Sequence, residues 1–305
     1  MPCHVHHPFS FLNLFAVLGM LFHVTALSDH AQLNQQLEPS SVRHYIEQLH
    51  AEKTLNNTAL VSKFYREHDF QPFWTGTYAA HSRADELIHV LRTAHLEGLV
   101  KPGHYASAIE AQQKLPDEKD RAWLDVLLTD AFLDYAQQAG RGQLDPRSLK
   151  EKWRYPLPKV NALSVLEKAF LSNNVEAVLR DLSPQYASYR RLVEARAFYI
   201  AIKERGGWPQ FAIYGPSLEL DTQSEEILLL RKRLQITGDL PANASQLANF
   251  GYELQEAVKR FQVRHGLDAD GVVGQTTRYA LHAPVEKRIQ QITANLERWR
   301  WLPRD

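Results

Sequence analysis

Apolar residues recur three and four positions apart along most of this chain, which is the spacing that places them on one face of an α-helix. Leu124, Leu128 and Ala131 show the pattern well, because they lie on a single stripe of residues 120–139. Strict alternation of apolar and polar residues, which is typical of strands, is scarce, and residues 210–214 are the best short candidate. The pattern therefore predicts an all-α fold, with helices over residues 82–95, 120–139, 160–171, 174–182 and 185–203.

Residues that favour caps and turns mark the ends of these predicted helices. Ser82 and Asp85 resemble a capping box, in which a serine and an acidic residue three positions later cap the first turn. We expect glycines to end two of the helices, Gly98 the first of them and Gly140 and Gly142 the second.

Two segments rich in proline, glycine and charge, residues 140–159 and 204–221, have the composition of linkers. We place a domain boundary in the second of them, near Pro216. The chain is therefore expected to hold a larger helical domain over residues 40–215 and a smaller domain over residues 222–282.

The smaller domain is expected to consist of three short helices. Its apolar residues recur at helical spacing, with Phe261 in the second helix, and short helices of this kind are stable only when they share a core. Gly266 lies where a glycine with a positive φ would follow the second helix. Thr276 or Thr277 is expected to cap the third helix at its N-terminus.

The first 28 residues contain no Lys, Arg, Asp or Glu, and residues 9–22 form an apolar run. A run of this length suits a signal peptide and is short for a bilayer span, which needs about 20 residues. Small residues fit cleavage after Ala26 or Ser28, and a retained N-terminal helix is the alternative. We expect a signal peptide over residues 1–28, an exported protein of the periplasm or cell envelope, and no membrane span after cleavage.

The composition argues against several classes of function. Lys and Arg number 35 and Asp and Glu number 35, and this balance argues against a nucleic-acid partner. Cys3 is the only cysteine, so the chain cannot form an internal disulfide, a CxxC redox pair or a thiolate zinc site. The histidines are scattered and no phosphate-binding or serine-nucleophile motif occurs, so no metal and no cofactor is expected. A pair of catalytic acids assembled from distant positions stays open.

One run carries a specific family resemblance. Residues 257–281, AVKRFQVRHGLDADGVVGQTTRYAL, closely resemble the type-1 peptidoglycan-binding domain, which has three helices. The positions that carry the resemblance are Ala257, Val258, Phe261, Gln262, Gly266, Leu267, Asp270, Gly271, Val272, Val273, Gly274, Thr277 and Leu281.

The surrounding sequence extends the resemblance to the large periplasmic murein L,D-transpeptidases. Residues 284–305 resemble the helical connector that joins the peptidoglycan-binding domain to the catalytic domain in that family. The region before residue 220 is similar to the family's scaffold domain, with weak motifs at Phe73-Trp74, Gly98-Leu99, Pro102 and Tyr105. The resemblance covers roughly residues 40–305.

The same resemblance implies chemistry that these residues cannot perform. The family cross-links peptidoglycan stem peptides through a cysteine acyl-enzyme in a C-terminal, mostly-β domain. No cysteine follows Cys3 and the His-Gly-Cys motif is absent, so we expect the catalytic domain to be missing and no residue here to be catalytic. Without that domain, Trp301 and the tail are expected to be exposed.

The expected function is therefore non-catalytic peptidoglycan binding in the cell wall. A separate transpeptidase catalytic domain is a further candidate partner. Two alternatives stay open: a truncated or split L,D-transpeptidase whose cysteine domain is encoded downstream, and a helical adaptor protein.

Two kinds of residue are singled out in the smaller domain. Recognition of a glycan needs exposed polar or aromatic groups near the turn, and the candidates for ligand binding are Arg264, Gln275 and Tyr279. The motif residues are expected to be mainly structural; they are Phe261, Asp270, Gly271, Gly274, Thr277 and Leu281.

Overall fold

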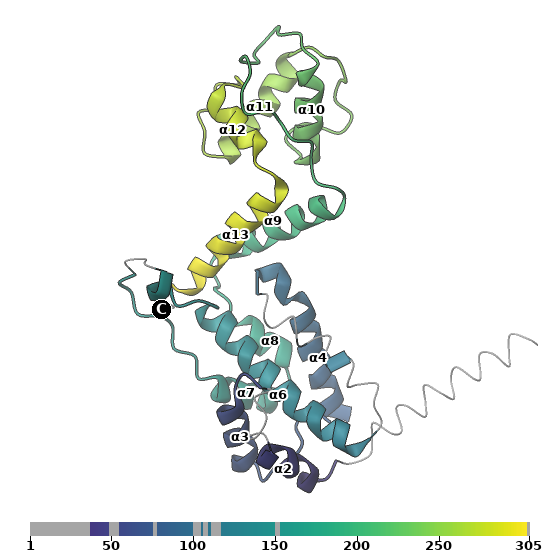
Figure 1. The fold of residues 1–305 in the computed structure, drawn as a ribbon, viewed down its shortest axis with the longest axis vertical. Helices are drawn as coiled ribbons and strands as arrows, with labels where there is room; N and C mark the ends of the chain where they lie inside the picture. The colour runs from purple at the N-terminus through teal and green to yellow at the C-terminus, as the bar shows by residue number, and fades with distance from the viewer. Residues whose placement is uncertain are drawn as a thin grey trace, which may run out of the picture. The chain divides into compact units, whose positions relative to one another are not determined.

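The computed structural model describes residues 37–48, 55–75, 78–99, 105, 109–110, 117–149 and 153–303, and for residues 78–80 it describes the backbone alone. Within these ranges every regular element is a helix, and the only strand-like pairing is two isolated bridges, Leu218 with Val273 and Gln223 with Asn249 (Figure 1). The prediction of an all-α fold is confirmed, whereas the strand suggested for residues 210–214 does not form. The predicted signal peptide and Pro102 lie outside the described residues.

The chain divides into two compact units. Unit 1 comprises Met1–Pro184 and Arg300–Asp305, and unit 2 comprises Gln185–Trp299. This division falls earlier than the predicted boundary near Pro216, because the helix that begins after Gln185 packs within unit 2. The domain bounds 40–215 and 222–282 stay predictions.

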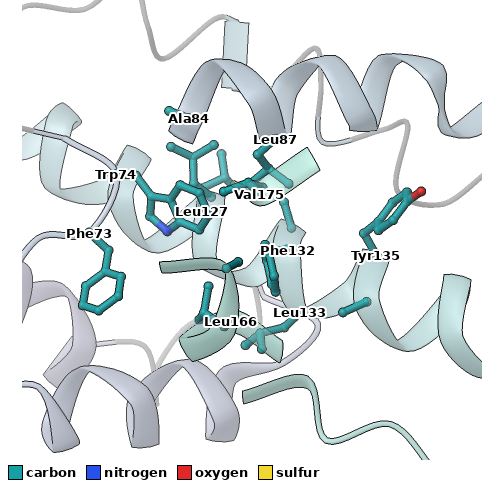
Figure 2. Close-up of a cluster of buried hydrophobic side chains, with 14 of the residues drawn as sticks. Phe73, Trp74, Ala84, Leu87, Leu127, Phe132, Leu133, Tyr135, Leu166 and Val175 are labelled. Atoms are coloured by element: carbon teal, nitrogen blue, oxygen red, sulfur yellow. The ribbon is translucent and has the colours of Figure 1, made fainter. Parts of the chain in front are cut away.

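Unit 1 is built around α6, the longest helix, which runs from Glu118 to Arg141 and is buried on nearly every side. Figure 2 shows Trp74, Leu127, Phe132, Leu166 and Val175 meeting in this core. The other elements of unit 1 are α2 (Pro39–Gln48), α3 (Thr58–Glu67), α4 (Tyr78–Thr93), η1 (Ala94–Glu97), η2 (Pro146–Leu149), α7 (Ala162–Ser172) and α8 (Val175–Arg180).

A buried carboxylate on α6 ties α3 and the segment after it to the core. Asp125 accepts hydrogen bonds from the Tyr65 hydroxyl at 2.6 Å and from the backbone N–H groups of Phe73 at 2.9 Å and Trp74 at 2.8 Å. Burial raises the pKa of Asp125, and these hydrogen bonds oppose that shift. A buried carboxylate with several donors is a structural anchor, since each donor would otherwise be unsatisfied.

Unit 2 holds the three-helix core that the sequence predicts. Buried apolar residues from α10, α11 and α12 form one cluster with Leu230, Leu254, Phe261 and Leu281 at its centre. The elements of unit 2 are α9 (Ala187–Glu204), α10 (Glu226–Ile236), α11 (Tyr252–Arg264), α12 (Gln275–His282) and α13 (Val285–Arg300), the last residue of which belongs to unit 1. Arg196 on α9 donates to the Thr293 hydroxyl on α13 at 2.9 Å, which links the two helices within unit 2.

Two helix ends in unit 1 differ from the predictions. α4 begins at Tyr78, so Ser82 lies inside the helix and the predicted capping box is wrong. Gly140 lies inside α6 and does not stop it. A Cβ at this position would overlap the Val160 side chain, so only glycine allows this close approach. Its role is close packing. Gly142 ends α6, and Gly98 ends η1 in the left-handed region, as predicted.

In unit 2 one predicted helix end is confirmed and one is wrong. Gly266 has a φ of +66° after α11, so the predicted left-handed glycine is confirmed. α12 begins at Gln275 directly after Gly274, so neither Thr276 nor Thr277 is its N-cap and that prediction is wrong.

The tail also differs from expectation within unit 1. Trp301 is only 4% exposed, and its ring meets the edge of Trp153 at 5.6 Å between centroids. The expected exposure of Trp301 is therefore wrong, because a tryptophan of the segment before α7 covers it. None of the helices in the described part of the chain combines the length and hydropathy that a bilayer crossing requires.

Candidate functional site

The exposed face of α12 carries two of the three predicted ligand-binding residues. Gln275 and Tyr279 are four positions apart, so they lie on the same side of the helix. Both are exposed, and Tyr279 is 70% exposed. The opposite side of α12 is buried in the domain core through Leu281. The helix therefore presents an aromatic ring and an amide to solvent on a rigid support.

A buried arginine fixes the loop beside α12. Arg278 forms a two-pronged ion pair with Glu226, with N···O distances of 2.6 and 2.7 Å, and donates to the carbonyls of Pro216 at 2.6 Å and Ala212 at 3.3 Å. A Cβ at Gly215 would come within 2.9 Å of this guanidinium, so the loop approaches Arg278 as closely as glycine allows. Charge-assisted, paired hydrogen bonds of this kind are strong and directional. The loop is therefore held in one position.

The same loop brings a second tyrosine to the surface. Gln275 donates through Nε2 to the carbonyl of Ile213 at 3.1 Å, and Tyr214 is the next residue of the loop that this contact holds. Tyr214 is 81% exposed. We call Tyr214, Gln275 and Tyr279 the tyrosine surface. Two exposed tyrosine rings with apolar faces and polar hydroxyls, one on a loop and one on a helix that these contacts hold in place, can stack on a sugar ring and hydrogen-bond its substituents.

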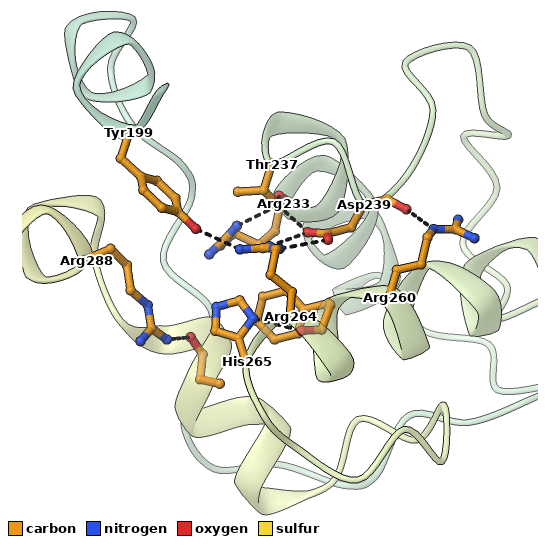
Figure 3. Close-up of polar contacts among 10 residues, drawn as sticks. Tyr199, Arg233, Thr237, Asp239, Arg260, Arg264, His265 and Arg288 are labelled. Atoms are coloured by element: carbon orange, nitrogen blue, oxygen red, sulfur yellow. Dashed lines mark hydrogen bonds and ion pairs between the residues drawn. The ribbon is translucent and has the colours of Figure 1, made fainter. Parts of the chain in front are cut away.

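Arg264, the third predicted ligand residue, lies at the end of α11 and already has protein partners. Its guanidinium contacts both carboxylate oxygens of Asp239 at 3.1 and 2.6 Å and donates to the Tyr199 hydroxyl at 2.7 Å (Figure 3). Asp239 is buried, so this ion pair neutralises a charge that would otherwise be costly. The structure thus gives Arg264 a stabilising role in unit 2 and does not place it on the tyrosine surface.

Two further arginines, Arg233 and Arg288, lie near Arg264. Arg233 is 1% exposed and its guanidinium lies over the Trp208 ring, 3.7 Å from the centroid. Burial, followed by the nearby positive charge of Arg264, lowers the pKa of Arg233 to about 9. Arg288 donates to the carbonyl of Ala280 at 2.8 Å (Figure 3).

His265 lies in the same region and stacks on Phe261, with 3.9 Å between ring centroids. Its Nδ1 lies 2.8 Å from the Phe261 carbonyl oxygen. Burial, together with the charges of Arg264 and two other arginines, lowers the pKa of His265 to about 4. The ring is therefore neutral near pH 7.

The motif residues surround one buried amide, Gln262. Its Nε2 lies 2.7 Å from Asp270 Oδ1 and 3.1 Å from Thr277 Oγ1, and its Oε1 accepts from the Gly271 N–H at 2.9 Å. Asp270 also accepts from the Val272 N–H at 2.8 Å, and this bond, followed by that from Gln262, lowers its pKa. The turn 268–273 is thereby fixed to α11.

The remaining motif residues act through the backbone or the core. Gly271 has a φ of +77°, in the left-handed region that favours glycine, and Gly274 immediately precedes α12. Phe261 and Leu281 are completely buried.

Sequence reasoning missed three residues that define this region. Gln262 was noted as part of the motif, but nothing in the sequence shows that its amide is the centre of the turn. Arg278 carries a full charge and would be expected in solvent, since buried arginines are uncommon. Tyr214 precedes Gly215-Pro216, which predicts a turn, but its exposure depends on the distant Gln275.

No group of His, Cys, Asp and Glu side chains in the described ranges is arranged to hold a metal ion.

Two family models match the chain. A model described as a scaffold domain matches residues 59–195, and a model described as a putative peptidoglycan binding domain matches residues 223–281. A comparison with the curated proteins found no match. The chain is thus an all-α protein with a scaffold domain followed by a peptidoglycan-binding domain, and the two domains support binding to the cell wall, with peptidoglycan as the partner.

The order and identity of these domains confirm the family resemblance drawn from the sequence. The chain carries the scaffold and peptidoglycan-binding domains of the large periplasmic murein L,D-transpeptidases. The tyrosine surface falls partly within the second match, since Gln275 and Tyr279 lie inside it and Tyr214 lies nine residues before it.

Proposed function

We propose that these 305 residues bind peptidoglycan in the cell wall without catalysing a reaction on it, and that the tyrosine surface makes the contact. The observation that carries the proposal is the fixed presentation of Tyr214 and Tyr279, because Arg278 and Gln275 hold both the loop and the helix in place. The peptidoglycan-binding match around α12 supports the choice of ligand. In this proposal Arg264 contributes by positioning α11 and contacts no ligand.

The non-catalytic part of the proposal rests on the sequence. Cross-linking by an acyl-enzyme needs a thiolate nucleophile, and no cysteine follows Cys3 within these 305 residues. We further propose that residues 1–28 direct export, which would place the protein in the periplasm or cell envelope.

A sacculus pull-down tests the binding surface. We expect the wild-type protein to sediment with purified peptidoglycan, and the double variant Tyr214→Ala/Tyr279→Ala to lose at least about tenfold in affinity, since exposed aromatic anchors often carry 1–2 kcal/mol each. Tyr155→Ala/Tyr252→Ala is the matched control, because both tyrosines are exposed and neither belongs to the surface.

Two results would contradict the proposal. Wild-type protein that sediments no better than an unrelated protein of similar size would exclude peptidoglycan binding. Equal binding by the wild type and the Tyr214→Ala/Tyr279→Ala variant would exclude the tyrosine surface as the contact.

The scaffold match over residues 59–195 favours a second candidate function. In this reading the chain is the binding part of a truncated or split L,D-transpeptidase, and a cysteine domain is encoded downstream. Sequencing the DNA after codon 305 tests it, and a reading frame with a His-Gly-Cys motif would favour it over independent binding. A third candidate, a helical adaptor, would be favoured if crosslinking in cells recovered proteins and no glycan.

A further inference from the structure

Unit 2 contains a cleft that the family resemblance does not explain. It has a volume of about 520 Å³ and lies between the end of α9, the segment 206–209 and the last turn of α10. None of the residues of the tyrosine surface lines it. The side chains that matter for its chemistry are Ile202, Arg205, Trp208, Lys232, Gln235 and Ile236.

The wall formed by Trp208 is rigid. Its indole N–H donates to the Ala283 carbonyl at 3.1 Å, and the Arg233 guanidinium lies 3.7 Å from the ring centroid. The edge of Tyr199 meets the same ring at 5.8 Å between centroids and an angle of 73°. Because three contacts fix this indole, a ligand that packs on its remaining surface would not have to order it.

The lining of the cleft is cationic. Arg205 and Lys232 contribute two positive charges, the lining includes no carboxylate, and the buried Arg233 lies behind the indole. α9 and α10 both end here, and each helix C-terminus carries a partial negative charge of about half a unit. These partial charges oppose the cations, but they sum to less than the two full charges of Arg205 and Lys232. The cleft therefore favours an anion.

The remaining polar group can accept a hydrogen bond. Gln235 uses its Nε2 on the carbonyls of Pro241 at 3.3 Å and Ala242 at 3.4 Å, which orients its Oε1 away from them. An amide N–H of a ligand is a suitable donor to that oxygen. The apolar walls, Ile202, Ile236 and the indole, suit small aliphatic groups next to the anion.

We propose that this cleft binds the free carboxylate end of a short peptide of the kind that peptidoglycan carries. Arg205 and Lys232 bind the carboxylate, Gln235 Oε1 accepts from a peptide N–H, and Trp208 and Ile236 pack on alanine methyl groups. A phosphate would use the two cations and neither the amide nor the apolar walls, so the lining favours the peptide. This proposal rests on the proposed function and names a second part of the same ligand.

Calorimetric titration of the full chain with two small probes tests the proposal. We expect N-acetyl-D-alanyl-D-alanine to bind and its C-terminal amide, which lacks only the negative charge, to bind at least tenfold more weakly. The affinity of the Arg205→Gln/Lys232→Gln variant for the free acid should also be at least tenfold lower than that of the wild type. Lys203→Gln/Lys287→Gln is the charge-matched control, because both lysines are exposed in unit 2 and outside the cleft, and it should bind like the wild type.

Three results would overturn the proposal. The first is equal affinity for the acid and the amide. The second is an equal loss of affinity for the acid in the two double variants. The third is displacement of the bound dipeptide by inorganic phosphate at a lower concentration than by unlabelled dipeptide. Sacculus sedimentation of the wild type separates the two proposals: binding to sacculi without binding of the dipeptide leaves the proposed function standing and rejects the cleft. Failure of sedimentation rejects the proposed function directly.

Discussion

Single residues in unit 2 show how a buried polar contact fixes a functional region. Gln262 joins α11 to Asp270, Gly271 and Thr277 through one side chain that is almost wholly buried. Because each of these groups would lose a partner if the amide were removed, the turn before α12 depends on it. The orientation of Gln275 and Tyr279 follows from that turn.

Gly271 provides the first prediction at this scale. Gly271→Ala should destabilise unit 2 by about 1–3 kcal/mol, since alanine is strained at a φ of +77° and its Cβ would come within 2.7 Å of the Gln255 side chain. Urea denaturation measures the change. Gly251→Ala is the control, because Gly251 has a φ of −94° and open space around it, so its effect should stay within about 0.5 kcal/mol. Equal losses in the two variants would contradict the prediction.

His265 provides the second prediction, which concerns the pH dependence of stability. Its pKa is about 4 in the folded protein, against about 6.5 in an unfolded chain, so the folded state disfavours the protonated ring. The stability due to the neutral ring is complete above pH 6.5 and is lost as the pH falls from 6.5 toward 4.

Wild-type unit 2 should therefore lose on the order of 2 kcal/mol between pH 7 and pH 4.5 that His265→Asn does not lose, after allowance for partial solvent screening. Urea denaturation at the two pH values measures the difference. His44→Asn, at an exposed position on α2, is the control and should follow the wild type. A His265→Asn variant with the same loss as the wild type would contradict the assignment.

At the scale of elements, the ends of some helices depend on packing contacts, which a local sequence pattern does not show. The Ser82-Asp85 pattern fits a capping box, yet α4 begins four residues earlier. By contrast, Asn161 and Asn174 cap α7 and α8, with their side chains accepting from Ser164 N–H at 3.2 Å and Ala177 N–H at 3.0 Å. The predicted ranges for these two helices were correct to within about two residues.

The third prediction follows from this difference. Asn174→Ala should destabilise unit 1 by about 1 kcal/mol, because the orphan N–H of Ala177 loses its acceptor. Ser82→Ala should change the free energy of unfolding by less than about 0.5 kcal/mol, because alanine is favoured inside a helix. Thermal denaturation of the two variants measures both values. A larger loss of stability in Ser82→Ala than in Asn174→Ala would support the capping box at Ser82.

For the whole molecule, the important feature is that each compact unit has its own core. Trp74, Leu127 and Phe132 belong to the core of unit 1, and Leu230 and Phe261 belong to that of unit 2. A unit with a separate core can unfold cooperatively on its own, and a single two-state transition is then not expected for the chain.

The fourth prediction is that calorimetry resolves two unfolding transitions. Gly271→Ala should lower the midpoint of one and Asn174→Ala the midpoint of the other, each by a few degrees, because about 1 kcal/mol shifts a domain of this size by roughly 4 °C. The transition of the unsubstituted unit should stay within about 1 °C. Parallel shifts of both transitions in both variants would show that the units unfold together.

The fold class and the core of the second domain follow from the order of apolar and polar residues along the chain. Helical spacing of apolar residues is a local property, and burial is its direct consequence, so Phe261 and Leu281 could be assigned to the core in advance. Gly266 was predicted for a similar reason, because the backbone conformation after a helix restricts the residue type at that position. The family resemblance depended on these same positions.

The polar residues that are available to a ligand depend, by contrast, on how distant segments pack together. Arg264 looks exposed in the sequence but is engaged by Asp239, which lies on a connection 25 positions away. Tyr214 belongs to the surface because Gln275, far along the chain, holds its loop. The cleft beside Trp208 brings the end of α9 to the end of α10. Such pairings depend on long-range packing, and no local pattern of residue types encodes them.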